Sequence, residues 1–433
     1  MRHEKYKDCG MEWIGGIPVH WDLIKYKYFA NLYTGNSIPD EEKNIYEEVD
    51  EGFSYISTKD VGVDRTIDYD NGMLIPFSNK KFKVAPKNST IMCIEGGSAG
   101  IKKAFLDMDV CFGNKLCCFD IKGVINKKYV YYLLNSPDYE QYFKLHVNGL
   151  IGGVNVQILK NFLAIQPSID EQNTIVKYLD DETSKIDSII KNLESEKEKL
   201  EVYKRELIAE VVTKGLDSNI PMKDSGVDWI GEVPEHWEVK KIKWIFKILK
   251  RQNGRDDRQV LSITQQGIKI KDIENNDGQM AESYENYQLV EPGDFAMNSM
   301  DLLTGWIDCS QYEGVTSPDY RVFRLIDIND HNNDFYNYLF QMCYTRRIFY
   351  RIGQGVSNLG RWRLQREPFL NMKVPVPPKA EQENISSFIR IKENKINVIV
   401  NEVEKQIEKL KEYRKILIHE AVTGKVKIDG GAK

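Results

Sequence analysis

The chain has 433 residues, 41% of them hydrophobic and 29% charged, which is the composition of a globular protein with two to four structural units. Because the N-terminus is charged and no run of about 18 apolar residues occurs, we expect neither a signal peptide nor a membrane span. Seven cysteines without a CxxC pair disfavour a disulfide framework or a zinc site, so we expect a reducing cytoplasm. A net charge of −5 is unusual for a small nucleic-acid-binding domain, unless basic residues gather on one face.

The first predicted element is an entry segment, Asp8–Trp21, which recurs 216 residues later as Asp224–Trp237. Two Trp, two Gly, a Pro and a His recur in register, so the chain contains a duplicated domain rather than a short solenoid repeat. His20 and His236 each precede a repeated Trp. We expect both to pack structurally, because no second His or Cys lies nearby at metal-ligand spacing.

A divergent domain follows each entry segment, and its pattern predicts a mixed α/β structure. Thr90–Ile94 and Tyr320–Leu325 are strand-like apolar runs, whereas Tyr131–Leu134 and Asn337–Phe340 favour helix. Each domain is expected to end in a Gly-containing loop and a Pro-bearing strand.

Two long helices are the strongest structural prediction. No Pro or Gly interrupts Thr174–Val212, Ser168 or Asp170 can cap its start, and Gly215 and Gly424 stand where helices stop. Apolar residues occupy every seventh position of each helix: Leu179, Ile186, Leu193, Leu200 and Leu207, then Ile389, Ile396, Val403, Leu410 and Leu417. The shared heptad phase predicts an antiparallel coiled coil rather than unrelated surface helices. A helix of about 40 residues spans roughly 60 Å, so the first helix would hold the two domains apart.

The expected fold class is therefore α/β (α+β), a pseudo-twofold repeat of two mixed domains separated by two long antiparallel helices. Its parts are a first domain at 1–168, a central helix at 169–215, a second domain at 216–378 and a C-terminal helix at 379–433.

Three repeated motifs resemble those of one known family. They are WIGxxPxHW in each entry segment, Pro-x-x-x-Glu-Gln at Pro167–Gln172 and Pro377–Gln382, and Leu-Ile-x-Glu-x-Val-Thr at 207–213 and 417–423. Across essentially the whole chain, the pattern is similar to the specificity subunits of type I restriction–modification systems. The resemblance implies two target-recognition domains that each bind one half of a bipartite, asymmetric double-stranded DNA site. It also implies that the helices set the spacer between the half-sites.

The same resemblance implies a cytoplasmic, non-catalytic DNA-recognition subunit with no membrane contact and neither cofactor nor metal in this chain. Two modification (methyltransferase) subunits would dock on the helices and supply S-adenosylmethionine and adenine methylation. Restriction subunits would add ATP- and Mg-dependent translocation and cleavage.

Most candidate DNA contacts lie in or next to Gly-rich loops. In the second domain they are Arg321 and, in the loop 353–363, Ser357, Asn358, Arg361 and Arg363, because arginine suits guanine edges and phosphates. In the first domain they are Lys102 and Lys103, which follow a Gly-rich turn, and Asn155, in a loop without arginine. The alternative for each is an ordinary solvated surface residue.

An enzyme is the competing interpretation, either a stand-alone DNA methyltransferase or a nuclease with an unrecognised catalytic motif. Ser136–Tyr139 and Ser317–Tyr320 approach the [DNS]PP[YF] motif of amine methyltransferases, but each has Asp in place of the second Pro. No Gly-rich cofactor loop accompanies them, so we expect turns. A pure coiled-coil scaffold would need neither divergent domain.

Overall fold

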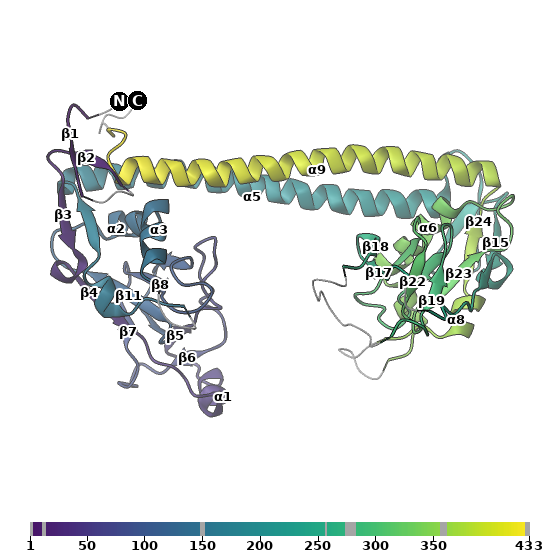
Figure 1. Cartoon of the computed structure of the whole chain (residues 1–433), viewed down its shortest axis with the longest axis horizontal. Helices are drawn as coiled ribbons and strands as arrows, with labels where there is room; N and C mark the ends of the chain where they lie inside the picture. The colour runs from purple at the N-terminus through teal and green to yellow at the C-terminus, as the bar shows by residue number, and fades with distance from the viewer. Residues whose placement is uncertain are drawn as a thin grey trace. The chain divides into compact units, whose positions relative to one another are not determined.

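The computed structural model describes residues 3–10, 14–147, 152–255, 258–272, 283–355 and 362–428, and the chain divides into two compact units (Figure 1). Unit 1 combines Met1–Leu193 with Lys405–Lys433, and unit 2 is Glu194–Glu404. The division crosses both long helices. Each unit therefore contains a mixed α/β domain, part of the central helix and part of the C-terminal helix.

Unit 1 contains two four-stranded sheets, β6-β5-β10-β7 and β4-β11-β8-β9, and the two-stranded sheets β1-β2 and β12-β3. Its strands are β1 (Tyr6–Asp8), β2 (Gly16–Pro18), β3 (Asp22–Lys25), β4 (Ala30–Thr34), β5 (Phe53–Ile56), β6 (Leu74–Ile75), β7 (Val84–Ala85), β8 (Thr90–Cys93), β9 (Lys103–Phe105), β10 (Val110–Phe112), β11 (Leu116–Ile121) and β12 (Leu163–Gln166). Its short helices are η1 (Tyr26–Tyr28), η2 (Asp40–Glu42), α1 (Lys43–Glu47), α2 (Lys127–Leu134), α3 (Pro137–Leu145) and α4 (Val156–Leu159). Strands β8 and β11 are buried along their whole length, so the sheet they share lies in the domain core.

Unit 2 contains the four-stranded sheet β16-β23-β20-β21 and the two-stranded sheets β13-β14, β15-β24, β17-β18 and β19-β22. Its strands are β13 (Met222–Asp224), β14 (Glu232–Pro234), β15 (Glu238–Lys241), β16 (Phe246–Ile248), β17 (Leu261–Thr264), β18 (Gly267–Ile270), β19 (Gln288–Val290), β20 (Phe295–Met297), β21 (Ile307–Cys309), β22 (Gly314–Thr316), β23 (Arg321–Leu325) and β24 (Lys373–Val376). Its short helices are η3 (Ile242–Trp244), α6 (Asn333–Thr345), α7 (Ile348–Arg351) and α8 (Arg366–Asn371).

The two domains share one topology although their sequences diverge. The antiparallel sheet β4-β11-β8-β9 of unit 1 has the same strand order as β16-β23-β20-β21 of unit 2, and the small sheets β1-β2 and β12-β3 correspond to β13-β14 and β15-β24. The predicted mixed α/β class is confirmed, with β8, β23, α2 and α6 at the expected positions. Ser136, by contrast, caps helix α3 with Pro137 in its first turn, a favourable position for proline, so the first SPDY segment starts a helix rather than forming a free turn.

The long helices are α5 (Ile169–Lys214) and α9 (Lys379–Val422). Every predicted heptad residue is buried or half-buried, and Leu179 and Ile389 are fully buried. Within unit 2, Lys197 Nζ lies 2.5 Å from Glu404 Oε1 and Lys204 Nζ lies 3.3 Å from Asn397 Oδ1. Residue numbers rise along α5 as they fall along α9, so the helices run antiparallel side by side, as Figure 1 shows. The predicted coiled-coil stripe is therefore confirmed.

Each entry segment packs against the end of a long helix in its own unit. Trp21 and Trp237 are almost completely buried. Gly424, which follows α9, lies against Trp21, and Gly215, which follows α5, lies against Trp237; both glycines adopt positive φ. A Cβ at Gly424 would meet the Trp21 ring at 2.9 Å, so glycine is needed there both for conformation and for space.

Candidate nucleic-acid interface

A polar network joins two of the repeated motifs in unit 1. Glu171, in the first turn of α5, lies 2.8 Å from His20 Nε2 and accepts a hydrogen bond of 3.0 Å from the Trp21 indole N–H. Its second carboxylate oxygen accepts hydrogen bonds from the backbone N–H and hydroxyl of Ser168, at 3.1 and 2.7 Å. Partial burial acts to raise the pKa of Glu171, but the hydrogen bonds from Trp21, His20 and Ser168 together lower it to about 2. The Ser–Glu pair is a capping box, which confirms the predicted Ser168 cap.

Unit 2 repeats the His–Trp–Glu part of this network, with Pro378 at the position of Ser168. Glu381 lies 2.6 Å from His236 Nε2 and accepts a hydrogen bond of 2.9 Å from the Trp237 indole N–H. His20 and His236 thus tie each entry segment to the start of a long helix.

The glutamine of each Pro-x-x-x-Glu-Gln motif positions a domain helix. Gln172 Oε1 accepts a hydrogen bond from Asn126 N at 2.9 Å, and Gln382 Oε1 accepts one from Asn332 N at 2.8 Å. Asn126 and Asn332 are the N-caps of α2 and α6. The repeated motifs therefore make the same contacts in both units. We call each entry segment, together with the Glu–Gln start and the glycine end of the long helices that it contacts, the frame. The divergent strands and loops of each domain are connected to this frame.

His3, His20 and Glu171 have ligand atoms within 4.8 Å of one another, the spacing of a possible metal site. Both Glu171 oxygens already accept protein hydrogen bonds. The second unit repeats the His–Glu pair with Asn219, not histidine, at the position equivalent to His3. The contacts of the His–Glu pair with the neighbouring tryptophan therefore account for its presence in both units, and no metal is needed to explain it.

In unit 1 the structure brings two of the predicted DNA-contact loops together. The turn between β8 and β9 pairs with the chain that leads to α4: Gly96 N donates to Gly152 O at 2.8 Å, and Val154 N donates to Ile94 O at 2.9 Å. Gly97 is exposed at the tip of this turn, and a Cβ there would meet no atom within 4 Å. Backbone hydrogen bonds therefore hold the two loops together.

The two lysines predicted for this turn have structural partners. Lys102 is half-buried and its ammonium donates to Thr58 O at 2.8 Å. Lys103 is fully buried, donates to Gly100 O at 2.7 Å and lies 3.0 Å from Glu140 Oε1. Burial lowers the pKa of Lys103 to about 8, an effect that the Glu140 carboxylate opposes. Lys103 thus faces the interior, so this conformation does not favour a DNA contact by its side chain.

Asn155 is exposed on the neighbouring loop, but its side chain has a local partner. It is the N-cap of α4, and its Oδ1 accepts a hydrogen bond from Ile158 N at 3.0 Å. The Asn155 amide nitrogen therefore remains the part of the side chain best placed for an external acceptor.

Unit 2 has an equivalent pair of loops. Leu302 N, in the turn between β20 and β21, donates to Trp362 O at 3.0 Å, and Leu364 N donates to Ser299 O at 2.9 Å. Gln354 and Arg363 exchange backbone hydrogen bonds of 2.8 and 2.9 Å, and the Arg363 side chain is exposed. Ser357, Asn358 and Arg361, also predicted DNA contacts, lie outside the described residues.

Arg321 is held within unit 2. Its Nη2 donates to Leu364 O at 2.8 Å, and its guanidinium lies 5.1 Å from the centre of the Phe369 ring. Burial lowers the pKa of Arg321 to about 10. The residue supports the Leu364 segment from behind, and this position favours a structural role over direct DNA contact.

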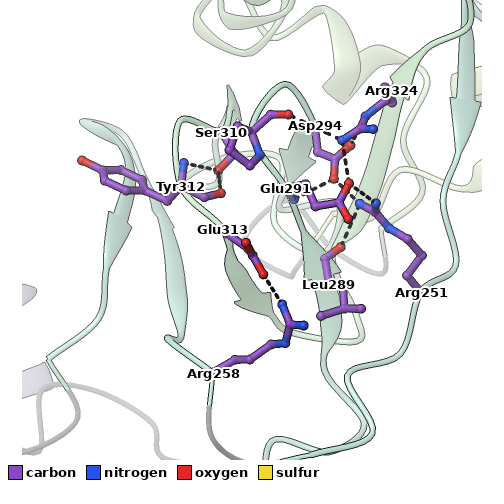
Figure 2. A network of polar contacts seen from close by, with 10 residues as sticks. Arg251, Arg258, Leu289, Glu291, Asp294, Ser310, Tyr312, Glu313 and Arg324 are labelled. Carbon is purple, nitrogen blue, oxygen red and sulfur yellow. Dashed lines mark hydrogen bonds and ion pairs between the residues drawn. The ribbon is translucent and has the colours of Figure 1, made fainter.

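Other arginines of unit 2 form the ion-pair network in Figure 2. Arg324 Nε lies 2.6 Å from Oδ1 of Asp294, which is fully buried, and Arg324 Nη2 lies 3.0 Å from Glu291 Oε2. Arg251 contacts the same two carboxylates, Asp294 and Glu291, from the other side. These arginines neutralise a buried carboxylate, which would cost several kcal/mol if left unpaired.

Sequence reasoning missed a set of exposed apolar residues on the long helices. Ile189 and Tyr413 in unit 1, and Tyr203 and Ile399 in unit 2, are each about half exposed. Ile399 follows Ile189, and Tyr413 follows Tyr203, by the same 210 residues that separate the heptad motifs. Comparing the outer positions of the two heptads, and not only their buried stripe, would have revealed these pairs.

Comparisons with known proteins agree on one family. A model of the type I restriction modification DNA specificity domain matches residues 18–201 and 234–409. The chain is 24% identical over 431 residues to the type I restriction enzyme MjaVIII specificity subunit of Methanocaldococcus jannaschii, covering 95% of this chain and 94% of that protein. A putative MjaX specificity subunit from the same organism is 23% identical over 319 residues, covering 71% and 70%.

A solved structure has the same fold. A chain from work on complex assembly and conformational transition of the type I R-M system matches with a TM-score of 0.67 at 13% identity, covering 94% of this chain and 98% of that one. Within the part of the chain that the structure describes, no helix is apolar enough over sufficient length to cross a membrane.

Proposed function

Because the chain belongs to the type I restriction modification DNA specificity family and is a specificity subunit, we propose that each unit binds one half of a bipartite, asymmetric DNA target. The supporting observation is the repeated pair of loops, at the β8–β9 turn of unit 1 and the β20–β21 turn of unit 2, on one constant frame. Their residues differ between the units, so two different half-sites are expected, whereas an identical pair would require a palindrome. Exposed Arg363 and Asn155 are the contacts that the geometry supports best. Ser357, Asn358 and Arg361 complete the proposed set on the loop of unit 2.

Two modification subunits are the proposed partners of the helical region. Isoleucine and tyrosine recur at equivalent exposed positions of α5 and α9, and half-exposed apolar side chains on a helix are suited to a protein contact. Because each unit has one such Ile–Tyr pair, the helices offer the same surface twice. Restriction subunits would join the resulting assembly.

We assign no reaction to this chain. In this proposal the modification subunits supply S-adenosylmethionine chemistry, and the restriction subunits supply ATP- and Mg-dependent steps, in the cytoplasm where the DNA is. The comparisons give no support to the alternative of a stand-alone methyltransferase or nuclease.

The deciding experiment measures methyl transfer from labelled S-adenosylmethionine to DNA. The chain alone should transfer no label, and adding its modification subunits should methylate adenines in one bipartite motif, identified by methylome sequencing. Label transfer by the purified chain alone would contradict the proposal. A motif without two separated half-sites would contradict the assignment of one half-site to each unit.

A further inference from the structure

An exposed aromatic residue occupies the same position in both units. Tyr28, the last residue of η1, is 70% exposed, and Trp244, the last residue of η3, is 67% exposed. The two positions are separated by 216 residues, the spacing of the entry segments. In each case the preceding lysine lies over the ring, with Lys27 Nζ 5.2 Å and Lys243 Nζ 5.6 Å from the ring centre. Large aromatic rings are usually buried, so a repeated exposed pair indicates a contact surface.

The neighbouring loop adds further exposed apolar side chains, one in unit 1 and two in unit 2. Lys122 N donates to Phe29 O at 2.7 Å, which places the loop after β11 beside Tyr28, and Val124 on this loop is 80% exposed. In unit 2 the equivalent bond joins Ile326 N to Ile245 O at 2.8 Å. There Ile326 and Ile328 are 53% and 67% exposed. We call Tyr28 with Val124, and Trp244 with Ile326 and Ile328, the aromatic patches.

Basic side chains border both patches. Lys25, Lys27 and Lys122 are exposed in unit 1, and Lys243 and Lys373 are exposed in unit 2. In unit 2 the patch adjoins a surface hollow of about 660 Å³, lined by Trp244, Ile326 and Lys373 and also by Asp327, Asp330 and His331. Of the residues in these borders, Lys122 already pairs with Asp120. The remaining lysines favour a partner surface that carries acidic groups around an apolar centre.

The position of the patches restricts the identity of the ligand. The aromatic residue in each patch belongs to a segment that continues directly from the repeated entry segment, whereas the proposed DNA-contact loops differ between the units. The repeated position of the ring, with a lysine before it in both units, favours one kind of ligand for both and argues against sequence-specific DNA bases. Phosphates would account for the lysines but not for the exposed Trp, Ile and Val side chains. Tryptophan and tyrosine surrounded by smaller contacts are typical of the energetic centres of protein interfaces.

We infer that the two aromatic patches are docking surfaces for two copies of one protein partner, the modification subunit, in addition to its contact with the helices. This inference rests on the proposed function and specifies where on each domain that partner binds. The partner face should present an apolar pocket bordered by aspartate or glutamate. One copy would bind through Tyr28 and the other through Trp244, so the two interactions can be removed separately.

The test uses the full chain with purified modification subunit and measures affinity and stoichiometry by titration and native mass spectrometry. Tyr28→Ser and Trp244→Ser should each weaken one of the two binding steps by about 30-fold, and the double variant should weaken both. Lys243→Glu should weaken the step at unit 2 and reduce its dependence on salt, because it reverses a charge in the border. Val63→Ser and Tyr312→Ser are the matched controls, since Val63 in unit 1 and Tyr312 in unit 2 are also exposed but lie outside the patches. Both controls should bind like the parent.

Other outcomes would overturn the inference. Unchanged binding of both modification subunits by the double variant, with unchanged thermal unfolding, would do so directly. Reduced DNA affinity at unchanged subunit affinity would assign the patches to the DNA backbone, and reduced self-association alone would assign them to a second copy of this chain. If the parent chain binds no modification subunit, the proposed function itself fails, which distinguishes that result from failure of the patches alone.

Discussion

Removing the carboxylate of Glu171 tests the frame on which the fold of unit 1 depends. In Glu171→Ala, the buried Trp21 indole N–H loses its acceptor, which costs about 1–3 kcal/mol. Loss of the capping box with Ser168 adds about 0.5–1 kcal/mol. The contact with His20, whose side chain is half exposed, adds about 0–1 kcal/mol after screening by solvent. We therefore expect the free energy of unfolding of unit 1 to fall by about 1.5–5 kcal/mol.

Differential scanning calorimetry measures this effect. For a unit of about 200 residues, the expected loss corresponds to a decrease in Tm of roughly 3–20 °C. Glu171→Gln keeps an acceptor for the indole and should lose clearly less than Glu171→Ala. Glu381→Ala should lower the Tm of unit 2 by less, because Pro378 stands at the position of Ser168 and no capping box is lost. Glu198→Ala, at an exposed position on α5, should leave both transitions in place. An unchanged Tm for Glu171→Ala would refute the reasoning.

Four further predictions follow from the same structure. Because the pKa of Glu171 is about 2 against an ordinary 4.5, its contribution to stability is complete above pH 4.5 and is lost as pH falls toward 2; an acid titration followed by fluorescence should show this loss in the parent and not in Glu171→Gln. Ile389→Ala should cost about 2–5 kcal/mol in denaturant unfolding, and Ile399→Ala less than about 0.5 kcal/mol, with weaker binding of modification subunits. Arg363→Ala should weaken DNA binding by the assembled complex by about 1–3 kcal/mol at constant stability, whereas Arg321→Ala should lower the Tm of unit 2. Inserting four residues, about one turn, into both α5 and α9 should lengthen the tolerated gap between half-sites in a methylome, and an unchanged gap would contradict the proposed spacer role.

The frame could be predicted from sequence because its determinants are local or repeated. Heptad spacing predicted a buried stripe on α5 and α9, and Ser168 was one of two caps expected for α5. Glycines after each helix were identifiable because a left-handed residue is commonly glycine. The long-range partners of these motifs, such as Trp21 with Glu171, required the three-dimensional structure.

The contacts of the recognition loops were less predictable, because a lysine or arginine side chain can bind either another part of the protein or the DNA. Lys103 follows a Gly-rich turn, which suggested DNA contact, yet strand β9 directs it into the core, where Glu140 on a distant helix neutralises it. Arg321 similarly supports Leu364. The common strand order of the two domains was also hidden. Many different apolar sequences can form the same buried sheet, so two domains can keep the same strand order after their sequences have diverged.

Unit 1 combines residues from both ends of the chain, and this arrangement affects the order in which the protein can fold during synthesis. Trp21 packs against Gly424, the Tyr6 hydroxyl donates to Gly424 O at 2.9 Å, and the Lys425 ammonium donates to Ile14 O at 2.9 Å. Unit 2, by contrast, is one continuous stretch of chain. On the ribosome, unit 2 can therefore complete its contacts first, although unit 1 begins earlier. The contacts of Trp21 and Tyr6 with Gly424 can form only after the last helix has been synthesised, so unit 1 is completed last although its synthesis begins first.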